Sequence, residues 1–240
     1  MSDFFQEFSR VMLENNRFNF IIEGLKNTFI ITIGSLVIGI ILGVIVAVVR
    51  STYDKNKPHL KKKGGTSYIM LSFLNGICKL YLTIIRGTPV VVQLMIFYFI
   101  IFASTDNGVA VATFAFGINS GAYVAEIFRS GIMAIDNGQF EAGRSLGLNY
   151  FQTMIYIIVP QMFKIVLPTL CNEFIVLLKE TSVAGYVGVI DLTKAGNTIA
   201  GRTFSYFIPL ITVAVIYLIV VIILTKLVGI LERRLRSSDH

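Results

Sequence analysis

The sequence predicts an all-α integral membrane protein of about five transmembrane helices, with its N-terminus outside, its C-terminus inside and one hairpin in the cytoplasm. Three observations lead to this prediction. The 240 residues are 55% hydrophobic, with a mean hydropathy of +0.74 and 15% charged residues, whereas an average soluble domain has about 25% charged residues. Two long stretches carry no charge, and the basic residues gather directly beside apolar stretches.

The N-terminal segment, residues 1–26, is predicted to be an external helix on the membrane surface. Phe4, Phe5, Phe8 and Met12 recur at near-helical spacing, which is typical of a helix with one apolar face. Acidic and basic residues are mixed along this segment, so it does not have the pattern of a cleaved signal peptide.

Five segments are predicted to cross the membrane within a single domain that covers residues 1–240. Phe29–Val49 and Ser205–Thr225 have no charged residue and, at about 1.5 Å per residue, each is long enough for a hydrocarbon core of roughly 30 Å. The other three are shorter or contain polar residues: Thr88–Ala103, Val109–Phe128 and Ile165–Leu178. The polar residues inside the last two need a separate explanation.

Residues Ser67–Ile85 are predicted to form an amphipathic helix that leads into the second crossing. Polar side chains follow one another along it at spacings of three and four: Ser72, Asn75, Lys79, Thr83 and Arg86. Gly87 and Pro89 then interrupt the helix, because proline removes a backbone donor and glycine loosens the turn. These two residues form either a plain corner or a hinge.

The distribution of basic residues sets the predicted orientation. Six basic residues follow the first crossing and four follow the last: Arg50, Lys55, Lys57, Lys61, Lys62 and Lys63, then Lys226, Arg233, Arg234 and Arg236. Such segments stay on the cytoplasmic side. Five crossings then place residues 1–26 outside, the segment 129–164 inside and the C-terminus inside.

The segment between the third and fourth crossings is predicted to be a hairpin of two short helices. Asn137-Gly138 is a turn pair, and residues 139–146 suit two helical turns that Gly147 ends. Asn149 is placed to cap a second helix, which Pro160 is expected to end.

The spacing within this hairpin resembles the signature loop of ATP-binding-cassette importer permeases. It has a Glu-Ala start, a glycine five positions past the alanine, and an Ile-x-aliphatic-Pro close after nine intervening residues. The resemblance implies that residues 139–160 form the coupling loop held by a separate ATPase. The coupling residues implied are Glu141, Ala142, Gly143, Gly147, Ile157 and Pro160.

Almost the whole chain, from about Gly24 to Leu235, is similar to the polar amino acid importer permeases of the histidine, glutamine and arginine type. The stretches that carry the resemblance are Gly24-Leu25-Lys26-Asn27-Thr28, Arg86-Gly87-Thr88-Pro89 with Gln93-Leu94, Asn119-Ser120-Gly121-Ala122-Tyr123 with Ala125-Glu126-Ile127-Phe128-Arg129, and Lys179-Glu180-Thr181-Ser182. The family more often has Asp at position 180 and a second Ala at position 143.

This resemblance implies a set of partners and a location. We expect two ATP-binding-cassette ATPase subunits, a second permease chain that is the same or a related one, an extracytoplasmic substrate-binding protein, an amino acid substrate and membrane lipid, but no nucleic acid. The location implied is the inner, cytoplasmic membrane of a cell, and transport would proceed by alternating access.

No enzyme activity is expected of this chain. It has no G-x-x-x-x-G-K-[ST] loop, so ATP and Mg²⁺ are expected to bind to the partner ATPase. Residues 143–147 match the G-x-S-x-G pattern of serine hydrolases, but the only histidine after Ser145 is the terminal His240. Cys78 and Cys171 have no metal-binding or disulfide spacing, and no metal site is predicted.

Polar residues within the crossings are candidates for a substrate cavity: Asn119, Tyr123, Glu126, Asn172 and Glu173. A buried carboxylate is costly unless it is paired or hydrated, and it often marks a transport pathway. Glu126 either accepts a substrate ammonium or guanidinium group, or pairs with an arginine three positions on and anchors its helix. Two acidic residues favour cationic or neutral polar amino acids.

Two other functions remain open from the sequence. The first is a membrane channel or scaffold that needs no ATP, which would leave the hairpin spacing unexplained. The second is an importer of the same family for another small polar solute. The sequence does not identify the amino acid, and it does not distinguish a homodimer from a heterodimer of permeases.

Overall fold

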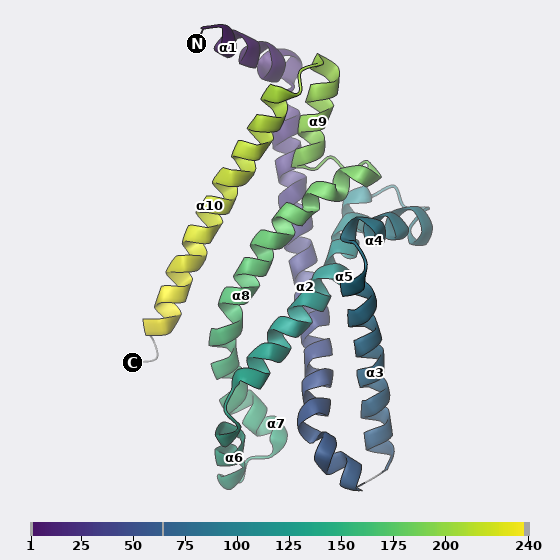
Figure 1. Cartoon of the computed structure of the whole chain (residues 1–240), viewed down its shortest axis with the longest axis vertical. Coiled ribbons are helices and arrows are strands. Elements are labelled where there is room, and N and C mark those ends of the chain that lie inside the picture. Colours follow the sequence, from purple (N-terminus) through teal and green to yellow (C-terminus); the bar gives the residue numbers. More distant parts are fainter. Residues whose placement is uncertain (1, 64, 238–240) are drawn as a thin grey trace. The chain divides into compact units, whose positions relative to one another are not determined.

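The computed structural model describes residues 2–63 and 65–237, and its described residues form helices and turns without a strand (Figure 1). The predicted all-α class is therefore confirmed. The α-helices are α1 (Ser2–Phe8), α2 (Phe18–Lys63), α3 (Thr66–Gly87), α4 (Val90–Ile96), α5 (Gly108–Ala134), α6 (Asn137–Ser145), α7 (Tyr150–Thr153), α8 (Val159–Glu180), α9 (Leu192–Thr203) and α10 (Phe207–Ser237). Short π-helical and 3-10 turns join several of them.

The described chain forms two compact units, and several long helices contribute to both. The first unit contains the chain up to Val37, residues 89–117 and residues 174–229. The second contains residues 38–88 and 118–173, together with the end of α10 from Ile230. Each unit has its own hydrophobic core.

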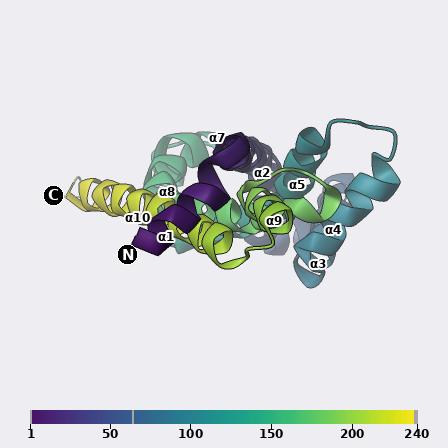
Figure 2. The same cartoon turned by 90° about the horizontal axis from the view of Figure 1, so that it is seen from above.

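The N-terminal segment differs from the single surface helix that the sequence predicted. Helix α1 ends at Phe8, and the chain turns through Asn15 and Asn16, which have φ angles of 54° and 55°, before α2 begins at Phe18. Met12 is fully buried in a cluster with residues of α2, α9 and α10. Figure 2 shows α1 beside the start of α10.

The left-handed turn explains this difference, because it folds the segment back and allows Met12 to pack on the protein. Phe5 is 67% exposed and Phe8 is partly buried, so only part of the predicted apolar face remains on the surface. The side chain of Phe4 lies outside the described residues.

Small residues allow α2 and α5 to pack closely in the second unit. A Cβ atom at Gly43 would lie 2.5 Å from Val124, and one at Gly39 would lie 3.0 Å from the Ser120 hydroxyl. Both distances are shorter than ordinary van der Waals contact, so a larger residue would push the helices apart. The neighbouring core contains Ala47, Phe128 and Ile158.

Five described helical segments are long and apolar enough to cross a membrane: Phe18–Lys55, Thr66–Gly87, Gly108–Ala134, Tyr150–Val187 and Phe207–Leu235. The predicted number is confirmed, but the second of these segments is α3 and not the predicted Thr88–Ala103. Residues 90–101 form only a shorter apolar helix, about 18 Å long at about 1.5 Å per residue, whereas α3 has the required length. The polar stripe of α3 led to its prediction as an amphipathic helix before the crossing and not as a crossing itself.

Candidate functional site

The hairpin between α5 and α8 has a well-defined beginning and end in its first helix (Figure 1). The Asp136 carboxylate caps α6 by accepting a hydrogen bond from the Gly138 N–H at 2.6 Å. At the other end, Gly147 has φ of +82°, and the Leu148 N–H donates to the Gly143 carbonyl at 3.1 Å. Gly147 therefore ends α6 as predicted, whereas the Asp136 cap was not recognised in the sequence.

The second half of the hairpin begins at a capping box. The Gln152 N–H donates to the Asn149 side chain at 2.9 Å, and the Asn149 N–H donates to the Gln152 side chain at 2.9 Å. These reciprocal bonds satisfy two backbone donors at the start of α7. The predicted cap at Asn149 is confirmed.

Pro160 does not end this second helix, which corrects the sequence prediction. Helix α8 continues from Val159 to Glu180, and Pro160 is its second residue. Directly before it, residues Met154–Ile158 form a π-helical turn, in which the Val159 N–H bonds to the Met154 carbonyl. Pro160 has no backbone N–H and carries a bulky ring, and this wider turn accommodates both features.

Two of the six predicted coupling residues, Gly143 and Ile157, lie on the inner side of the hairpin, and the other four are exposed. Gly143 is buried, and a Cβ atom there would lie 2.7 Å from Thr153 and 3.0 Å from Ile157, so these residues hold the two halves of the hairpin together. Glu141 and Ala142 are exposed on α6. The inner residues therefore form a frame, and the outer ones form a surface.

Two large apolar side chains on this surface were missed in the sequence. Leu146 is 78% exposed and Phe151 is 70% exposed, on either side of the turn at Gly147. Large apolar side chains so exposed beside a turn are typical of a protein interface. Their position beside the glycine was the only signal in the sequence.

Side chains from α2 and α8 attach the hairpin to the rest of its unit. The Lys55 amine lies 3.5 Å from the centre of the Phe140 ring and donates a hydrogen bond to the Asn137 side chain at 3.3 Å. The Gln161 amide donates to the Gln139 side chain at 3.2 Å. Helix α6 is thus connected to α2 by a cation–π contact and to α8 by a polar contact.

A group of charged residues surrounds Glu126, the acidic residue predicted in the third crossing. Its carboxylate lies 2.8 Å from Arg50, 3.8 Å from Arg86 and 3.8 Å from Arg129. Arg129 also forms an ion pair with Asp54 at 3.0 Å. These contacts join α2, α3 and α5 within the second unit.

The pairing of Glu126 with Arg129, three residues on, matches the anchoring alternative drawn from the sequence. The nearer partner, Arg50, was recognised there only as a basic residue that follows the first crossing. Because guanidinium groups already surround the Glu126 carboxylate, its direct use by a cationic substrate would require their displacement. The substrate role of Glu126 remains a prediction.

The other predicted cavity residues are not brought together in the same way. The Arg86 guanidinium lies 5.6 Å from the centre of the Tyr123 ring. Since Arg86 also lies near Glu126, Tyr123 belongs to the same neighbourhood. Asn119 is buried, and the neighbouring Ser120 hydroxyl donates to Glu173 at 3.1 Å. Asn172 is exposed on α8.

A cleft of about 450 Å³ opens beside Glu126. It is lined by Arg50, Lys79, Leu82, Thr83, Arg86, Gly87 and Glu126. Glu126 is the one predicted cavity residue in this lining. The predicted hinge residue Gly87 also lines the cleft. The polar stripe of α3 contributes three side chains to it.

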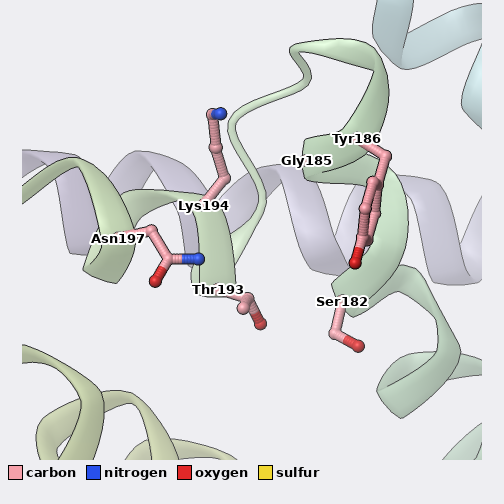
Figure 3. Close-up of a pocket in the computed structure, with 6 residues that line it drawn as sticks. All are labelled: Ser182, Gly185, Tyr186, Thr193, Lys194 and Asn197. Atoms are coloured by element: carbon pink, nitrogen blue, oxygen red, sulfur yellow. The ribbon is translucent and has the colours of Figure 1, made fainter.

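A second pocket, of about 400 Å³, lies in the first unit between the 3-10 helix Thr181–Val187 and α9. It is lined by Ser182, Gly185, Tyr186, Thr193, Lys194 and Asn197. Figure 3 shows the Lys194 amine pointing away from the hydroxyls of Thr193 and Ser182. The polar groups of this second pocket therefore do not point toward one common ligand position.

The Gly24–Thr28 stretch has a structural purpose in the same unit. A Cβ atom at Gly24 would lie 2.6 Å from the Asp191 carbonyl oxygen, so only glycine fits there. The Asn27 amide donates to the Ile190 carbonyl at 2.9 Å, and the Thr28 hydroxyl accepts from the Leu192 N–H at 3.1 Å. These contacts hold the segment before α9 against α2.

Asp191 caps α9 and is fully buried, with the Thr193 and Lys194 N–H groups donating to its carboxylate at 2.8 and 3.3 Å. Burial raises the pKa of Asp191 above its ordinary value, although these hydrogen bonds oppose the shift. A raised pKa in the folded state means that acidification stabilises the fold through this group, and that this stabilisation disappears as pH rises through the folded pKa.

We therefore expect Asp191→Asn, which keeps an acceptor for the cap, to retain wild-type thermal stability at neutral pH. As pH falls, the wild type should gain stability relative to this variant. Asp191→Ala should lose about 1 kcal/mol at neutral pH because the cap is removed. Thermal unfolding of the purified proteins across a pH series measures both effects, and an identical loss in the two variants would contradict the capping role.

The sequence and the fold resemble known transport proteins. Residues 66–237 match the family model described as "Binding-protein-dependent transport system inner membrane component". The chain is 37% identical to the arginine transport system permease protein ArtQ of Bacillus subtilis (strain 168), over 92% of this chain and 94% of that protein. It is 34% identical to the glutamine transport system permease protein GlnP of Escherichia coli (strain K12), over 90% and 93%.

Solved structures agree with these matches. An amino acid ABC transporter crystallised with histidines contains a chain that is 36% identical, with a TM-score of 0.77 over 90% of this chain and 94% of that one. The methionine ABC transporter MetNI, in an inward-facing conformation, shares the fold at 19% identity, with a TM-score of 0.76 over 92% and 99%. The protein is thus an integral membrane protein of the binding-protein-dependent transport system inner membrane component family, which comprises the permease subunits of ATP-binding-cassette importers.

Proposed function

We propose that this chain is the membrane-spanning permease subunit of an ATP-driven importer of polar amino acids. The observation that carries the proposal is the 139–160 hairpin. Buried Gly143, packed against partly buried Ile157, supports an exposed surface that includes Glu141, Leu146 and Phe151. This arrangement suits a handle that a separate ATPase holds, because its stiff frame can transmit the movement of a partner.

The proposed orientation places the hairpin in the cytoplasm. Arg50 and Lys55 lie near the end of the first membrane-length helix, and Lys226, Arg233 and Arg234 lie in the last turns of the fifth. With these basic ends inside, the five crossings place the N-terminus outside and the C-terminus inside. The location proposed is the inner membrane of the cell.

The proposed assembly contains two ATP-binding-cassette ATPases, a second permease chain and an extracytoplasmic substrate-binding protein. ATP and Mg²⁺ bind to the ATPases, whose closure moves the hairpins. Lys55 and Gln161 transfer that movement to α2 and α8 through their contacts with α6. The transport path then alternates between access from the two sides of the membrane.

The proposed hinge is the break between α3 and α4. Helix α3 ends at Gly87, Thr88 is extended with φ −124° and ψ 148°, and Pro89 caps α4. Because Thr88 is extended and Pro89 has no backbone N–H, small changes at these residues can redirect the chain after α3.

The proposed substrates are polar amino acids, because the relatives named for a substrate are arginine and glutamine permeases. Residues Asn119, Tyr123, Glu126, Asn172 and Glu173 remain the proposed cavity residues. The competing proposals are an importer of another small polar solute and an ATP-independent channel or scaffold. A channel leaves the rigid hairpin and its exposed apolar residues without a purpose.

Mild extraction of the tagged chain from its native membrane tests the proposed assembly. We expect mass spectrometry to identify a P-loop ATPase that is recovered with the chain in near-equal amount. A chain recovered without an ATPase, under conditions that keep a known importer intact, would contradict the proposal and favour the channel alternative. Recovery of the ATPase without amino acid uptake would instead favour another solute.

A further inference from the structure

The cleft beside Glu126 has an excess of positive charge. Three cationic side chains, Arg50, Lys79 and Arg86, line it together with one acidic side chain, Glu126. Arg129, which also lies near the Glu126 carboxylate, is balanced by its ion pair with Asp54 at 3.0 Å. The lining therefore has a net charge of +2 and favours an anionic ligand over a cationic one.

Two cationic side chains in this lining are available to such a ligand. Arg50 is held by Glu126 at 2.8 Å and is 15% exposed, so it contributes positive charge to the lining. The Arg86 side chain is 47% exposed and reaches Glu126 only at 3.8 Å. Lys79 is exposed, and no described acidic side chain forms an ion pair with it. Arginine and lysine placed in this way bind oxyanions through charge-assisted hydrogen bonds.

Another face of α3 is apolar and exposed. At about 100° per residue, Ile77, Leu80 and Ile84 share a face that follows the polar stripe round the helix, and they are 50%, 61% and 52% exposed. Helix α3 is long and apolar enough to cross a membrane, so this ridge is suited to contact with acyl chains. A charged cleft beside an apolar ridge matches a ligand that has an anionic head and hydrocarbon chains.

We propose that the Arg50–Lys79–Arg86 cleft binds the phosphate of an anionic phospholipid, whose acyl chains lie along the exposed ridge of α3. Basic pockets between membrane helices bind anionic headgroups in this way. A lipid without a headgroup cation, such as phosphatidylglycerol, leaves no positive group to face the arginines. Phosphatidylcholine carries such a group and is bound less well. This proposal needs no particular substrate and no ATPase.

The test uses the full-length protein in nanodiscs that contain equal amounts of phosphatidylglycerol and phosphatidylcholine. Native mass spectrometry after release from the nanodisc reports which lipid stays bound. We expect wild type to retain phosphatidylglycerol, and Lys79→Gln or Arg86→Gln to bind it about fivefold more weakly, the loss expected for one basic residue. Thr83→Arg, which adds a cation to the lining, should strengthen retention.

Lys226→Gln is the matched control, because it removes an exposed lysine from the membrane helix α10, outside the cleft lining. It should retain phosphatidylglycerol as wild type does. Equal retention of the two lipids by wild type, or equal losses in Lys79→Gln and Lys226→Gln, would overturn the proposal.

Two competitors identify the source of the bound anion. Retained phosphatidylglycerol should resist excess inorganic phosphate, because the acyl chains contribute to binding. Displacement by phosphate would overturn the assignment of the α3 ridge to the chains. Displacement by a free amino acid would assign the cleft to a carboxylate and overturn the lipid proposal.

Discussion

Glu141→Lys is expected to abolish ATP-driven uptake while the chain still enters the membrane. Glu141 is exposed in the middle of α6, and no hydrogen bond or ion pair joins it to another described residue. Its replacement therefore removes nothing that holds the described fold, and a functional loss must arise at the partner. A reversed charge at a protein interface costs several kcal/mol, which corresponds to a loss of affinity of at least about 30-fold.

The measurement is substrate uptake into proteoliposomes together with the amount of ATPase that remains bound to the purified chain. Glu14→Lys makes the same charge reversal at an exposed residue far along the sequence from the hairpin, and it should leave both unchanged. Gly143→Val tests the frame separately, since its side chain would collide with Thr153 and Ile157. Normal uptake in both Glu141→Lys and Gly143→Val would exclude coupling through this hairpin.

Glu126→Gln is expected to produce the largest loss of stability among single conservative changes in the second unit. The variant keeps the size of the side chain but leaves Arg50, Arg86 and Arg129 without their shared counter-charge. Arg50 is only 15% exposed, so water compensates it poorly. We expect a loss of about 2 kcal/mol, within the range for a partly buried charged group that loses its partner.

Thermal unfolding in detergent measures this loss, and Glu23→Gln, at an exposed acid of α2, provides the control. The double variant Glu126→Gln/Arg50→Gln should be less destabilised than the sum of the two single variants, because each removes the same pair. Strict additivity would show that the pair contributes no stability. If Glu126→Gln keeps both wild-type substrate affinity and uptake, the hypothesis that Glu126 binds a substrate cation is wrong.

The long helices could be predicted from the sequence because hydrophobic length is a local property. The charge-free stretch Phe29–Val49 lies within α2, and Ser205–Thr225 overlaps most of the last membrane-length helix. The hairpin was predictable for a similar reason, since Gly147 acts through its own backbone and the Asn149 side chain accepts from the N–H of Gln152, only three residues on. These signals depend on a few neighbouring residues and need no knowledge of the tertiary structure.

Errors occurred where distant contacts or helix geometry decided the outcome. Pro160 is tolerated because the preceding turn is π-helical, which the sequence pattern did not indicate. Met12 is buried because the chain folds back at Asn15 and Asn16. Thr88–Ala103 is uncharged, yet its helical part is shorter than α3, whose charged residues disfavoured it as a crossing.

The polar residues near Glu126 illustrate the same limit. Asn119 and Glu126 both lie in the predicted crossing Val109–Phe128 and on α5, but the sequence did not reveal that Arg50, 76 positions before Glu126, is its nearest ionic partner. Likewise, Lys55 was seen only as an orienting charge, whereas it contacts Phe140 in the hairpin. Partners so far apart in the chain are brought together by the packing of helices, and a local sequence pattern does not show which helices pack together.

The measurement that tests the central claim most directly is uptake of labelled arginine and glutamine by proteoliposomes that contain the chain, its co-purified ATPase and the substrate-binding protein. We predict that an amino acid accumulates against its gradient only when ATP is present on the hairpin side, and that Glu141→Lys prevents this. Movement that only equalises the two sides, with or without ATP, would contradict the account and identify a channel.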